Sequence, residues 1–257
     1  MADNYEDFKK QILTLTGIDL NAYKENQMKR RIDSLITRSQ AGGYDGYVRL
    51  IRENKDKFEE FVNYLTINVS EFWRNPEQWK ILENLVLPNI LKKDGLKIWS
   101  AACSTGDEPY SLVMLLNKYL PFHKIKITAT DIDKQVLALA KQGVYTGRSV
   151  KGLPEDFKKN YFNVRPDGAY EVKSEVKNCV TFKEHNLLKD YYPNGCDLIV
   201  CRNVLIYFTE EAKDKIYADF YKSLNHGGYL FLGSTEQILD PSKFGFASAS
   251  SFFYKKE

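Results

Sequence analysis

The sequence predicts an α/β protein whose first quarter forms a separate all-helical domain. From about residue 95 onward, strand-like apolar runs alternate with helical segments of roughly 10 to 15 residues, which favours βαβ units and a mostly parallel, doubly wound sheet. Before residue 70, apolar positions recur every three or four residues, as is typical of helices. Between 146 and 178 the alternation stops, and a Pro-Asp-Gly turn between short extended runs predicts an inserted β-hairpin subdomain.

Amphipathic helices account for the N-terminal domain, which we place at residues 1–70. Gly17 and the pair Gly42-Gly43 separate them. Residues 71–94 are expected to be a linker that becomes helical after Pro76. The three apolar faces along the chain are Phe8, Ile12 and Leu15; Met28, Ile32, Leu35 and Ile36; and Phe58, Val62 and Leu65.

The sheet domain is expected to span residues 95–257. The helix after Phe208 has Thr209 as its N-cap and Gly227 as its stop signal. The tail 244–257 is expected to add an antiparallel edge pair. In chain order, the predicted elements are a strand 96–103, a helix 108–120, a strand 125–133, a helix 134–145, strands 180–188 and 196–208, a helix 209–225 and a strand 227–237.

Composition narrows the class of protein. The chain has 257 residues, 43% of them hydrophobic, which is enough for a sizeable core. Its N-terminus lacks the pattern of a signal peptide, and no apolar run reaches the length of a membrane span, so we expect a cytoplasmic protein without membrane insertion. We also expect a monomer. The four cysteines show no paired spacing and are expected to be free and buried, and the three histidines show no metal spacing. A net charge of +3 is too small to indicate nucleic-acid binding.

The stretch 98–112, "IWSAACSTGDEPYSL", indicates what the sheet domain binds. A strand that runs into a helix through small residues lets a ligand approach the main chain. A dinucleotide site would need G-x-G-x-x-G, but here only Gly106 is a glycine, and Asp107 and Glu108 would repel a phosphate. Asp131, at the end of the second strand, stands where a carboxylate accepts hydrogen bonds from a ribose. A positively charged nucleoside without phosphate fits both facts, and S-adenosylmethionine (SAM) is such a molecule.

Five segments in this order resemble the CheR family of chemoreceptor glutamate methyltransferases. They are "WSAACSTGDEPYSL", "ATDID", "NLL", "CRNVLIYF" and "GSTE", and the match runs from about residue 60 to 240. The resemblance implies a Rossmann-like SAM-dependent methyltransferase domain with an inserted small β-subdomain, preceded by an all-α N-terminal domain. It implies methyl transfer to glutamate carboxylates of chemoreceptors, with S-adenosylhomocysteine as the product and no metal.

The resemblance also implies roles for single residues. Glu108 would hold the methionine amine, Asp131 the ribose, and Asn186 with Leu187 the adenine. Tyr207 would place its hydroxyl near the transferred methyl group. The further cofactor contacts would be Asn68, Ser70, Arg74, Arg202 and Asn203.

Simpler interpretations exist for each of these residues taken alone. Asp131 suits a helix cap, Glu108 suits the first turn of a helix, and Tyr207 stands in an apolar run typical of a core. A SAM-dependent methyltransferase of another substrate, or a non-catalytic SAM-binding regulator, would share the same pocket. The chain lacks the N/D-P-P-Y/F motif of nucleic-acid amino methylases, and the intact set of pocket residues argues against a non-catalytic module.

The expected chemistry needs no general base. A glutamate side chain has an ordinary pKa of about 4.3, so it is already an ionised nucleophile at neutral pH. The enzyme must align that carboxylate with the sulfonium methyl and exclude water. Arg74 and Tyr207 are the residues expected to orient the two reactants.

A basic stripe on the second helix is the expected substrate-docking surface. Lys24, Arg31 and Arg38 recur every seven residues and therefore share one face of the helix. Methylation sites of chemoreceptors lie on glutamate-rich coiled coils in the cytoplasm, which a basic stripe would attract. The alternative is a solvated face that flanks the helical core.

Overall fold

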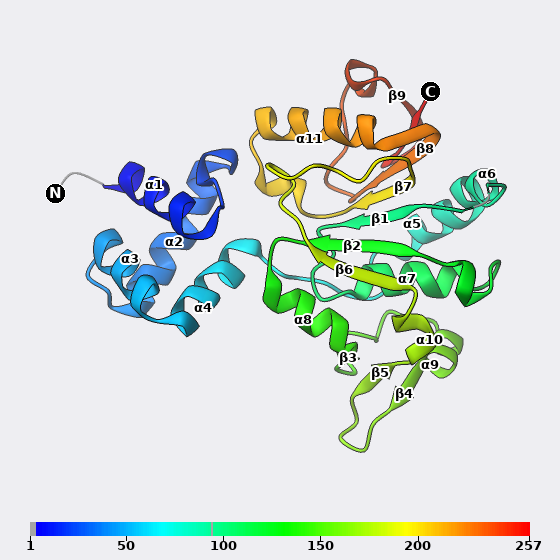
Figure 1. Cartoon of the computed structure of the whole chain (residues 1–257), viewed down its shortest axis with the longest axis horizontal. Helices are drawn as coiled ribbons and strands as arrows, with labels where there is room; N and C mark the ends of the chain where they lie inside the picture. Colours follow the sequence, from blue (N-terminus) through cyan, green and yellow to red (C-terminus); the bar gives the residue numbers. More distant parts are fainter. Residues whose placement is uncertain (1–3, 94) are drawn as a thin grey trace. The chain divides into compact units, whose positions relative to one another are not determined.

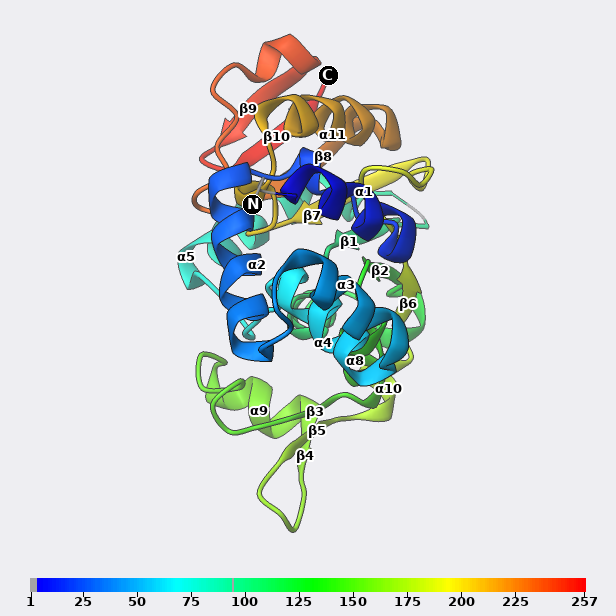
Figure 2. The same ribbon diagram turned by 90° about the vertical axis from the view of Figure 1, so that its left-hand side faces the viewer.

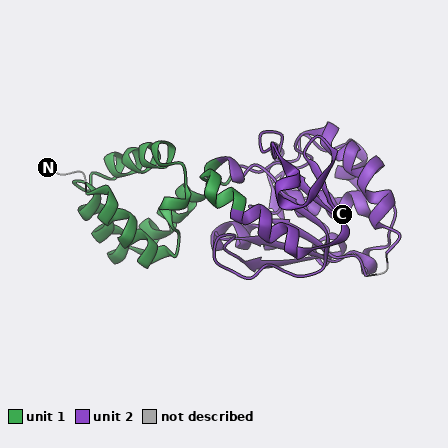
Figure 3. Ribbon diagram, turned by 90° about the horizontal axis from the view of Figure 1, so that it is seen from above, with its two compact units in different colours: residues 1–68, 207–214 green, residues 69–206, 215–257 purple. Residues whose placement is uncertain are grey.

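The computed structural model describes residues 4–93 and 95–257. The chain divides into two compact units (Figure 3): unit 1 comprises 1–68 and 207–214, and unit 2 comprises 69–206 and 215–257. Residues 1–3 and 94, which belong to the expected N-terminal domain and linker, lie outside the described residues. No helix within the described ranges is both long and apolar enough to cross a bilayer.

Unit 1 is helical, as the sequence predicts. The buried side chains include Phe8 and Ile12 of the first predicted face and all four residues of the second. A further helix, α3, follows Gly43 and buries Tyr47, Val48 and Ile51. The elements are α1 (Tyr5–Thr16), the short 3₁₀ turn η1 (Leu20–Ala22), α2 (Glu25–Ser39), α3 (Tyr44–Glu53) and α4 (Lys55–Thr66).

The buried face of α4 differs from the predicted one. Phe61 and Leu65 are buried, whereas Phe58 and Val62 are half-buried. The aromatic ring of Phe61 lies 5.6 Å from that of Tyr47, which fixes the stripe through positions 61 and 65 against the core. Residues 58, 61, 62 and 65 share one side of a helix, so spacing alone does not decide which of them face inward.

Residues 207–214 complete unit 1 although they are distant in sequence. The backbone N–H of Lys24 donates to the Tyr207 carbonyl at 2.9 Å, and that of Thr209 donates to the Ala22 carbonyl at 2.8 Å. The rings of Tyr23 and Phe208 pack against each other at a tilt of 40°, with centroids 4.8 Å apart. Helix α11 (Glu210–Ser223) begins in this segment, and the hydroxyl of Thr209 caps it by accepting the Ala212 N–H at 3.3 Å. The predicted N-cap is confirmed.

Unit 2 contains a seven-stranded sheet in the order β6-β2-β1-β7-β8-β10-β9 (Figure 1). The first five strands are parallel, and β10 and β9 are antiparallel, so the predicted doubly wound sheet and the edge pair in the tail are both confirmed. The bounds are β1 (Ile98–Ala101), β2 (Ile127–Asp131), β6 (Val180–Glu184), β7 (Cys196–Cys201), β8 (Leu224–Leu232), β9 (Phe246–Ser250) and β10 (Phe253–Lys256).

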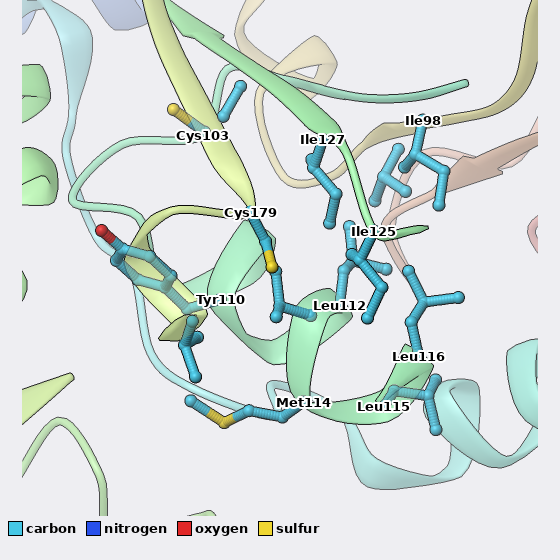
Figure 4. Close-up of a cluster of buried hydrophobic side chains, with 14 of the residues drawn as sticks. Ile98, Cys103, Tyr110, Leu112, Met114, Leu115, Leu116, Ile125, Ile127 and Cys179 are labelled. Carbon is cyan, nitrogen blue, oxygen red and sulfur yellow. The ribbon is translucent and has the colours of Figure 1, made fainter. Parts of the chain in front are cut away.

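Helices cover both faces of this sheet. Helices α7 (Asp107–Leu116) and α8 (Lys134–Gln142) contact β2 and β6. Ile98 of β1 lies among the α7 side chains Leu112 and Leu116 in the apolar cluster of Figure 4. Its neighbour Trp99 points to the other face, where its ring lies 5.6 Å from that of Phe220 in α11. Successive residues of a strand face opposite sides, so both sides of β1 are buried.

The segment expected as a linker is part of unit 2. Trp79, Leu82 and Val86 are fully buried in the core cluster of that unit, together with Leu87 and Ile90. These residues form one nearly continuous helical stretch, made of α5 (Pro76–Ile81), a π-helical turn η2 (Leu82–Val86) and α6 (Leu87–Ile90). Because the apolar side of the stretch has a sheet to cover, it packs as a core helix.

A small antiparallel sheet, β3-β5-β4, forms the inserted subdomain. Its strands are β3 (Val144–Tyr145), β4 (Phe162–Val164) and β5 (Tyr170–Val172), flanked by α9 (Glu155–Tyr161) and α10 (Ser174–Lys177). The predicted hairpin is β4–β5, which projects away from the large sheet (Figures 1 and 2). Residues 144 and 145, expected at the end of a helix, form β3 because Gly143 adopts a left-handed conformation (φ 66°) and ends α8.

Two strand boundaries differ from the prediction. Strand β7 ends at Cys201 rather than Phe208, because Asn203 adopts φ 63°, and a 3₁₀ turn η4 (Leu205–Tyr207) follows. Strand β8 begins at Leu224, directly after α11, so Gly227 lies within the strand and is not the helix stop. The short η3 (Phe122–Lys124) and η5 (Pro241–Phe244) complete the unit.

The β10 strand is expected to be essential for the stability of unit 2. Phe253 is fully buried and stacks on Phe231 of β8 with ring centroids 4.2 Å apart. The Phe253→Ala variant should lose about 3 to 5 kcal/mol of unfolding free energy, as is usual when a buried aromatic ring is removed. Chemical denaturation followed by tryptophan fluorescence measures this loss. Leu239→Ala, at a side chain that is 96% exposed, is the control. Equal effects of the two substitutions would contradict the packing role.

Candidate functional site

The carboxyl ends of β1, β2 and β7 meet at one edge of the sheet in unit 2, where ligands of doubly wound sheets bind. A small cavity of about 40 Å³ lies at this edge. Its lining includes Ser70, Arg74, Ser104, Glu108, Arg202 and Asn203. Five of these six residues were singled out from the sequence, and Ser104 was not.

The turn between β1 and α7 is built from unusual backbone conformations. Ala102, Ser104 and Gly106 adopt φ values of 61°, 48° and 90°. A side chain at position 106 would come within 2.9 Å of the Ala140 Cβ, so glycine is required there. The turn is held by the Cys103 N–H, which donates to the Thr130 carbonyl at 2.8 Å. This bond keeps the main chain of the turn close to the end of β2.

Asp131 ends β2 and is directed at this turn. One carboxylate oxygen accepts the backbone N–H of Ser104 at 2.8 Å, and the other accepts that of Asp133 at 3.0 Å. The side chain is buried, and burial raises the pKa of the Asp131 carboxyl to about 6. The cap of α8 is Asp133, whose side chain accepts the Gln135 N–H at 2.8 Å, so capping does not explain Asp131.

Glu108 lies in the first turn of α7, but its carboxylate turns back toward the sheet. It accepts the Ser100 hydroxyl at 2.8 Å, and its other oxygen lies 3.7 Å from Nη1 of Arg202. Burial raises the pKa of Glu108, while Arg202 and Ser100 oppose this rise. The Glu108 side chain therefore does more than offset the dipole of α7.

Arg202 is a buried cation that ties three segments together. Its Nη2 donates to the Arg74 carbonyl at 2.8 Å and to the side-chain oxygens of Asn75 at 3.1 Å and Gln78 at 2.7 Å. The guanidinium lies over the ring of Phe231, 4.7 Å from its centroid. Only Nη1 faces Glu108, and at a longer distance, so most of the hydrogen bonds of Arg202 serve to hold the segment around Arg74.

Glu236 organises the loop that carries Arg202 and Asn203, and sequence reasoning assigned it no role. Its Oε2 accepts the backbone N–H of Asn203 at 2.6 Å and of Gly233 at 2.8 Å, and its Oε1 accepts that of Leu205 at 2.6 Å. A Cβ at position 233 would come within 2.5 Å of this carboxylate, so only glycine fits there. The "GSTE" motif was the available signal, since a glycine and an acid three residues apart match this arrangement.

Ser70 and Arg74 border the cavity on the segment before α5. The Ser70 hydroxyl hydrogen-bonds the carboxylate of Asp107, which is buried and also accepts the Thr105 hydroxyl at 2.6 Å. Burial raises the pKa of Asp107. The guanidinium of Arg74 donates to the Val69 carbonyl at 3.3 Å. Ser70 therefore supports the β1–α7 turn as well as the cavity wall.

Asn186 and Leu187 follow β6, beside β2 but outside the lining of the cavity. The backbone N–H of His185 donates to the Asp131 carbonyl at 2.9 Å, which brings this loop to the same edge of the sheet. The Asn186 side chain accepts the Leu188 N–H at 2.9 Å, and Leu187 is buried.

The remaining predicted site residues belong to unit 1. Asn68 donates from its side chain to the Thr66 hydroxyl at 2.8 Å, and Tyr207 is half-buried at the end of η4. Arg31 stacks on Tyr64 of α4 at 4.6 Å and donates to its carbonyl at 2.7 Å. Lys24 and Arg38 are exposed. Of the basic stripe, Arg31 thus also joins α2 to α4.

The polar groups around the cavity suit a polar, cationic ligand. Four carboxylates near these strand ends, those of the buried Asp107, Asp131 and Glu236 and of the partly exposed Glu108, have pKa values raised by burial. Of these four, Glu108 lines the cavity. The Oγ of Ser104 and the Oδ1 of Asn203 are buried without a hydrogen-bond partner among the described residues, and buried polar atoms of this kind need one. SAM has the hydroxyl, amine and sulfonium groups to meet these needs. Within the described ranges, no group of His, Cys, Asp and Glu side chains is placed to hold a metal ion.

The chain matches two protein families along nearly its whole length. Residues 3–66 match "CheR methyltransferase, all-alpha domain", and residues 68–253 match "CheR methyltransferase, SAM binding domain". The chain is similar to the chemotaxis protein methyltransferase of Listeria innocua, with 40% identity over 255 residues, 98% of this chain and 97% of the relative. The corresponding Listeria monocytogenes protein is 41% identical with the same coverage. Chemotaxis protein methyltransferase 2 of Vibrio cholerae is 33% identical over 90% of this chain and 84% of its own.

Replacing Glu236 should disturb the cavity without touching a ligand. Glu236→Gln keeps the shape of the side chain but exchanges one acceptor oxygen for a donor, so a buried N–H is left without a partner. We expect a loss of about 1 to 3 kcal/mol in unfolding free energy and weaker binding of S-adenosylhomocysteine. Denaturation and titration calorimetry measure the two effects. Glu155→Gln, at a side chain that is 87% exposed, is the control. Unchanged stability and affinity in Glu236→Gln would refute the role.

Proposed function

The chain belongs to the CheR family of SAM-dependent chemotaxis protein methyltransferases, and from this membership we propose that it esterifies glutamate side chains of chemoreceptors. The enzyme methylates chemoreceptors with SAM, and residues 68–253 form its SAM-binding domain. The observation that supports our assignment of the site most directly is Asp131, a buried carboxylate held by two backbone N–H groups at a strand end. The glutamate acceptor and the roles of single residues are the proposal.

The residues around the cavity fit the parts of SAM. The chemistry that SAM supplies is an electrophilic methyl group on a sulfonium sulfur. Asp131 accepts hydrogen bonds from the ribose, and Glu108 binds the amine of the methionine part. Asn186 and Leu187 contact the adenine. The remaining contacts of the proposed site are Asn68, Ser70, Arg74, Arg202 and Asn203. The cavity holds about 40 Å³, against roughly 300 Å³ for sites that enclose a small molecule, so the cofactor would extend beyond it along the strand ends.

The residues of this chain act in the reaction by positioning. The substrate glutamate is ionised at neutral pH, so no side chain has to remove a proton from it. Arg74 and the hydroxyl of Tyr207 orient the carboxylate for in-line attack. A bond forms between a glutamate oxygen and the methyl carbon while the bond from that carbon to sulfur breaks, and S-adenosylhomocysteine is released.

The experiment that tests this function uses SAM labelled in its methyl group. The full chain is incubated with cytoplasmic fragments of chemoreceptors, and the modified protein is then treated with mild base. Glutamyl methyl esters release volatile methanol under these conditions, whereas methylated nitrogen keeps its label. Label that resists base, or no transfer to any receptor fragment, would contradict the proposal.

Tyr207→Phe separates orientation from cofactor binding. The variant keeps the ring and removes only the hydroxyl, so turnover should fall at least tenfold while affinity for S-adenosylhomocysteine stays within about twofold. Single-turnover rates and calorimetry give the two quantities. Normal turnover would make Tyr207 a structural residue, and lost affinity would make it a binding group.

The affinity for S-adenosylhomocysteine should depend on the ionisation of Asp131. The pKa of this carboxyl is raised to about 6, and only the ionised form offers both oxygens to the ribose hydroxyls. The affinity should therefore be highest above pH 7 and fall as the pH decreases through 6. At pH 5 it should be about tenfold below this maximum. Asp131→Asn should bind weakly at every pH and lose this component of the profile. A flat profile of the unmodified enzyme between pH 8 and 5 would show that Asp131 does not contact the cofactor in its ionised form.

We further propose that the basic stripe of α2 docks the glutamate-rich coiled coil of a chemoreceptor. Lys24 and Arg38 are exposed, which leaves their charges available to an acidic helix. The guanidinium groups of Arg31 and Arg38 both lie over the ring of Tyr64, at 4.6 and 5.1 Å from its centroid. Arg31 contributes less to docking, because it also donates to the Tyr64 carbonyl and is less exposed. The cytoplasm is the matching compartment, since all four cysteines are buried free thiols, as is typical of reducing surroundings.

Reversing the two exposed charges should impair docking alone. Lys24→Glu with Arg38→Glu is expected to lower receptor methylation at least tenfold at low salt, with a smaller loss at high salt because exposed charges are screened. Affinity for S-adenosylhomocysteine should not change. Lys10→Glu with Lys55→Glu, at side chains 78% and 86% exposed on α1 and α4, matches the change in net charge. Equal losses in both double variants would mean that the stripe is a solvated face.

A further inference from the structure

A second cavity, of about 760 Å³, opens at the opposite edge of the sheet in unit 2. It lies at the start of β1 and β2, beside Ile98 and Thr128, and is bounded by the chain before each of these strands. Pro193 and Cys196, the first residue of β7, complete its wall. Strand β1 has four residues and separates this edge from the SAM site by about 13 Å. The proposed methyl transfer uses none of the residues that line this cavity.

Basic side chains surround the cavity. Lys97, Lys124 and Lys126 line it and are exposed, and no carboxylate of the described residues is within ion-pair distance of them. Lys93, which also lines it, is paired with Asp197 at 2.9 Å. The carboxylate of Asp197 is further occupied, because it also accepts the Lys97 backbone N–H at 3.1 Å and the Asn225 amide at 3.0 Å.

The sequence around the cavity has the same charge bias. The stretches 91–99 and 120–128 contain five lysines and one acid, Asp94. This excess of positive charge is local, since the whole chain carries only +3. A concave site lined by charges of one sign concentrates ligands of the opposite sign.

The other walls of the cavity are apolar. Leu91 and Leu120 are half-buried and Leu96 is nearly buried, and all three line it together with the ring of His123. Sites for small molecules usually hold about 300 to 1,000 Å³ and combine apolar walls with a few polar groups. The volume and the lining of this cavity match that description.

We propose that this cavity binds a phosphorylated small molecule of nucleotide size. The ammonium groups of Lys97, Lys124 and Lys126 receive the phosphates, and the leucine side chains and the His123 ring contact the organic part. A cluster of unpaired lysines suits phosphate as a group of point charges. The volume favours a small molecule over a peptide, because an extended acidic segment would need a longer groove.

The test is titration calorimetry of the full chain with magnesium-free ATP, in the presence of saturating S-adenosylhomocysteine. Saturation keeps the adenine of ATP out of the SAM site, so the heat reports the second cavity. Lys97→Glu with Lys126→Glu should weaken ATP binding at least tenfold and leave S-adenosylhomocysteine affinity unchanged. Lys141→Glu with Lys159→Glu, two exposed lysines outside the cavity, is the matched control and should stay within about twofold.

Three results would overturn the proposal. The first is no ATP binding once the SAM site is saturated. The second is an equal loss in the cavity and control variants, which would indicate non-specific attraction. The third is tighter binding of an oligoglutamate peptide than of ATP with the same dependence on Lys97 and Lys126, which would assign the cavity to an acidic protein segment. If the charge-reversed variant does not fold, as judged by S-adenosylhomocysteine binding, Lys97→Ala with Lys126→Ala takes its place with the same expected loss.

Discussion

Burying the charge of Arg202 is the constraint on which the proposed cofactor site in unit 2 depends. A buried guanidinium needs acceptors nearby, and here the segment 74–78 accepts from Nη2 while Glu108 lies beside Nη1; Nε has no partner among the described residues. The segment before α5 must therefore lie against the sheet, which brings Ser70 and Arg74 to the cavity. Glu236 meets the complementary need, because it holds the backbone of the loop that begins with Arg202. The positions of Ser70 and Arg74 beside the cavity therefore follow from the need to satisfy the buried charge of Arg202.

Local pattern in the sequence was sufficient for the sheet and for the acids at its strand ends. The positions of Asp131 and Glu108 could be predicted because they depend on where a strand ends or a helix begins, and periodicity shows those boundaries. Glu236 could not be assigned, since its function depends on backbone N–H groups about thirty residues away in sequence. The end of β7 at Cys201 was missed for a related reason, because Asn203 has a positive φ and its N–H donates to the distant Glu236. In α4, the packing of Phe61 against Tyr47 determines which of two equally apolar stripes is buried.

The two edges of the large sheet have opposite electrostatic character. At the carboxyl edge lie acids whose ionised forms are disfavoured by burial. A cation or a group of hydroxyls bound there would stabilise these ionised forms. The amino edge collects exposed lysines around an open cavity. Because methyl transfer to a carboxylate neutralises both reactants, strong stabilisation of the separated ions would slow the reaction. In the proposed site, acids that are already hydrogen-bonded would orient the cofactor through directed hydrogen bonds, without strongly stabilising its positive charge.

The return of residues 207–214 to unit 1 has a consequence for biosynthesis. Tyr23 and Phe208 pair within this unit, yet residues 69–206 are translated between its two parts. While the ribosome synthesises that stretch, the four N-terminal helices lack Phe208, the partner of Tyr23. Domains usually fold as units in order of synthesis, so this domain is an exception. The last step of folding in unit 1 therefore comes after most of the sheet has been made. Tyr207 lies in the segment of unit 1 that arrives last, so the proposed catalytic hydroxyl is placed only after β1, β2, β6 and β7 have been synthesised.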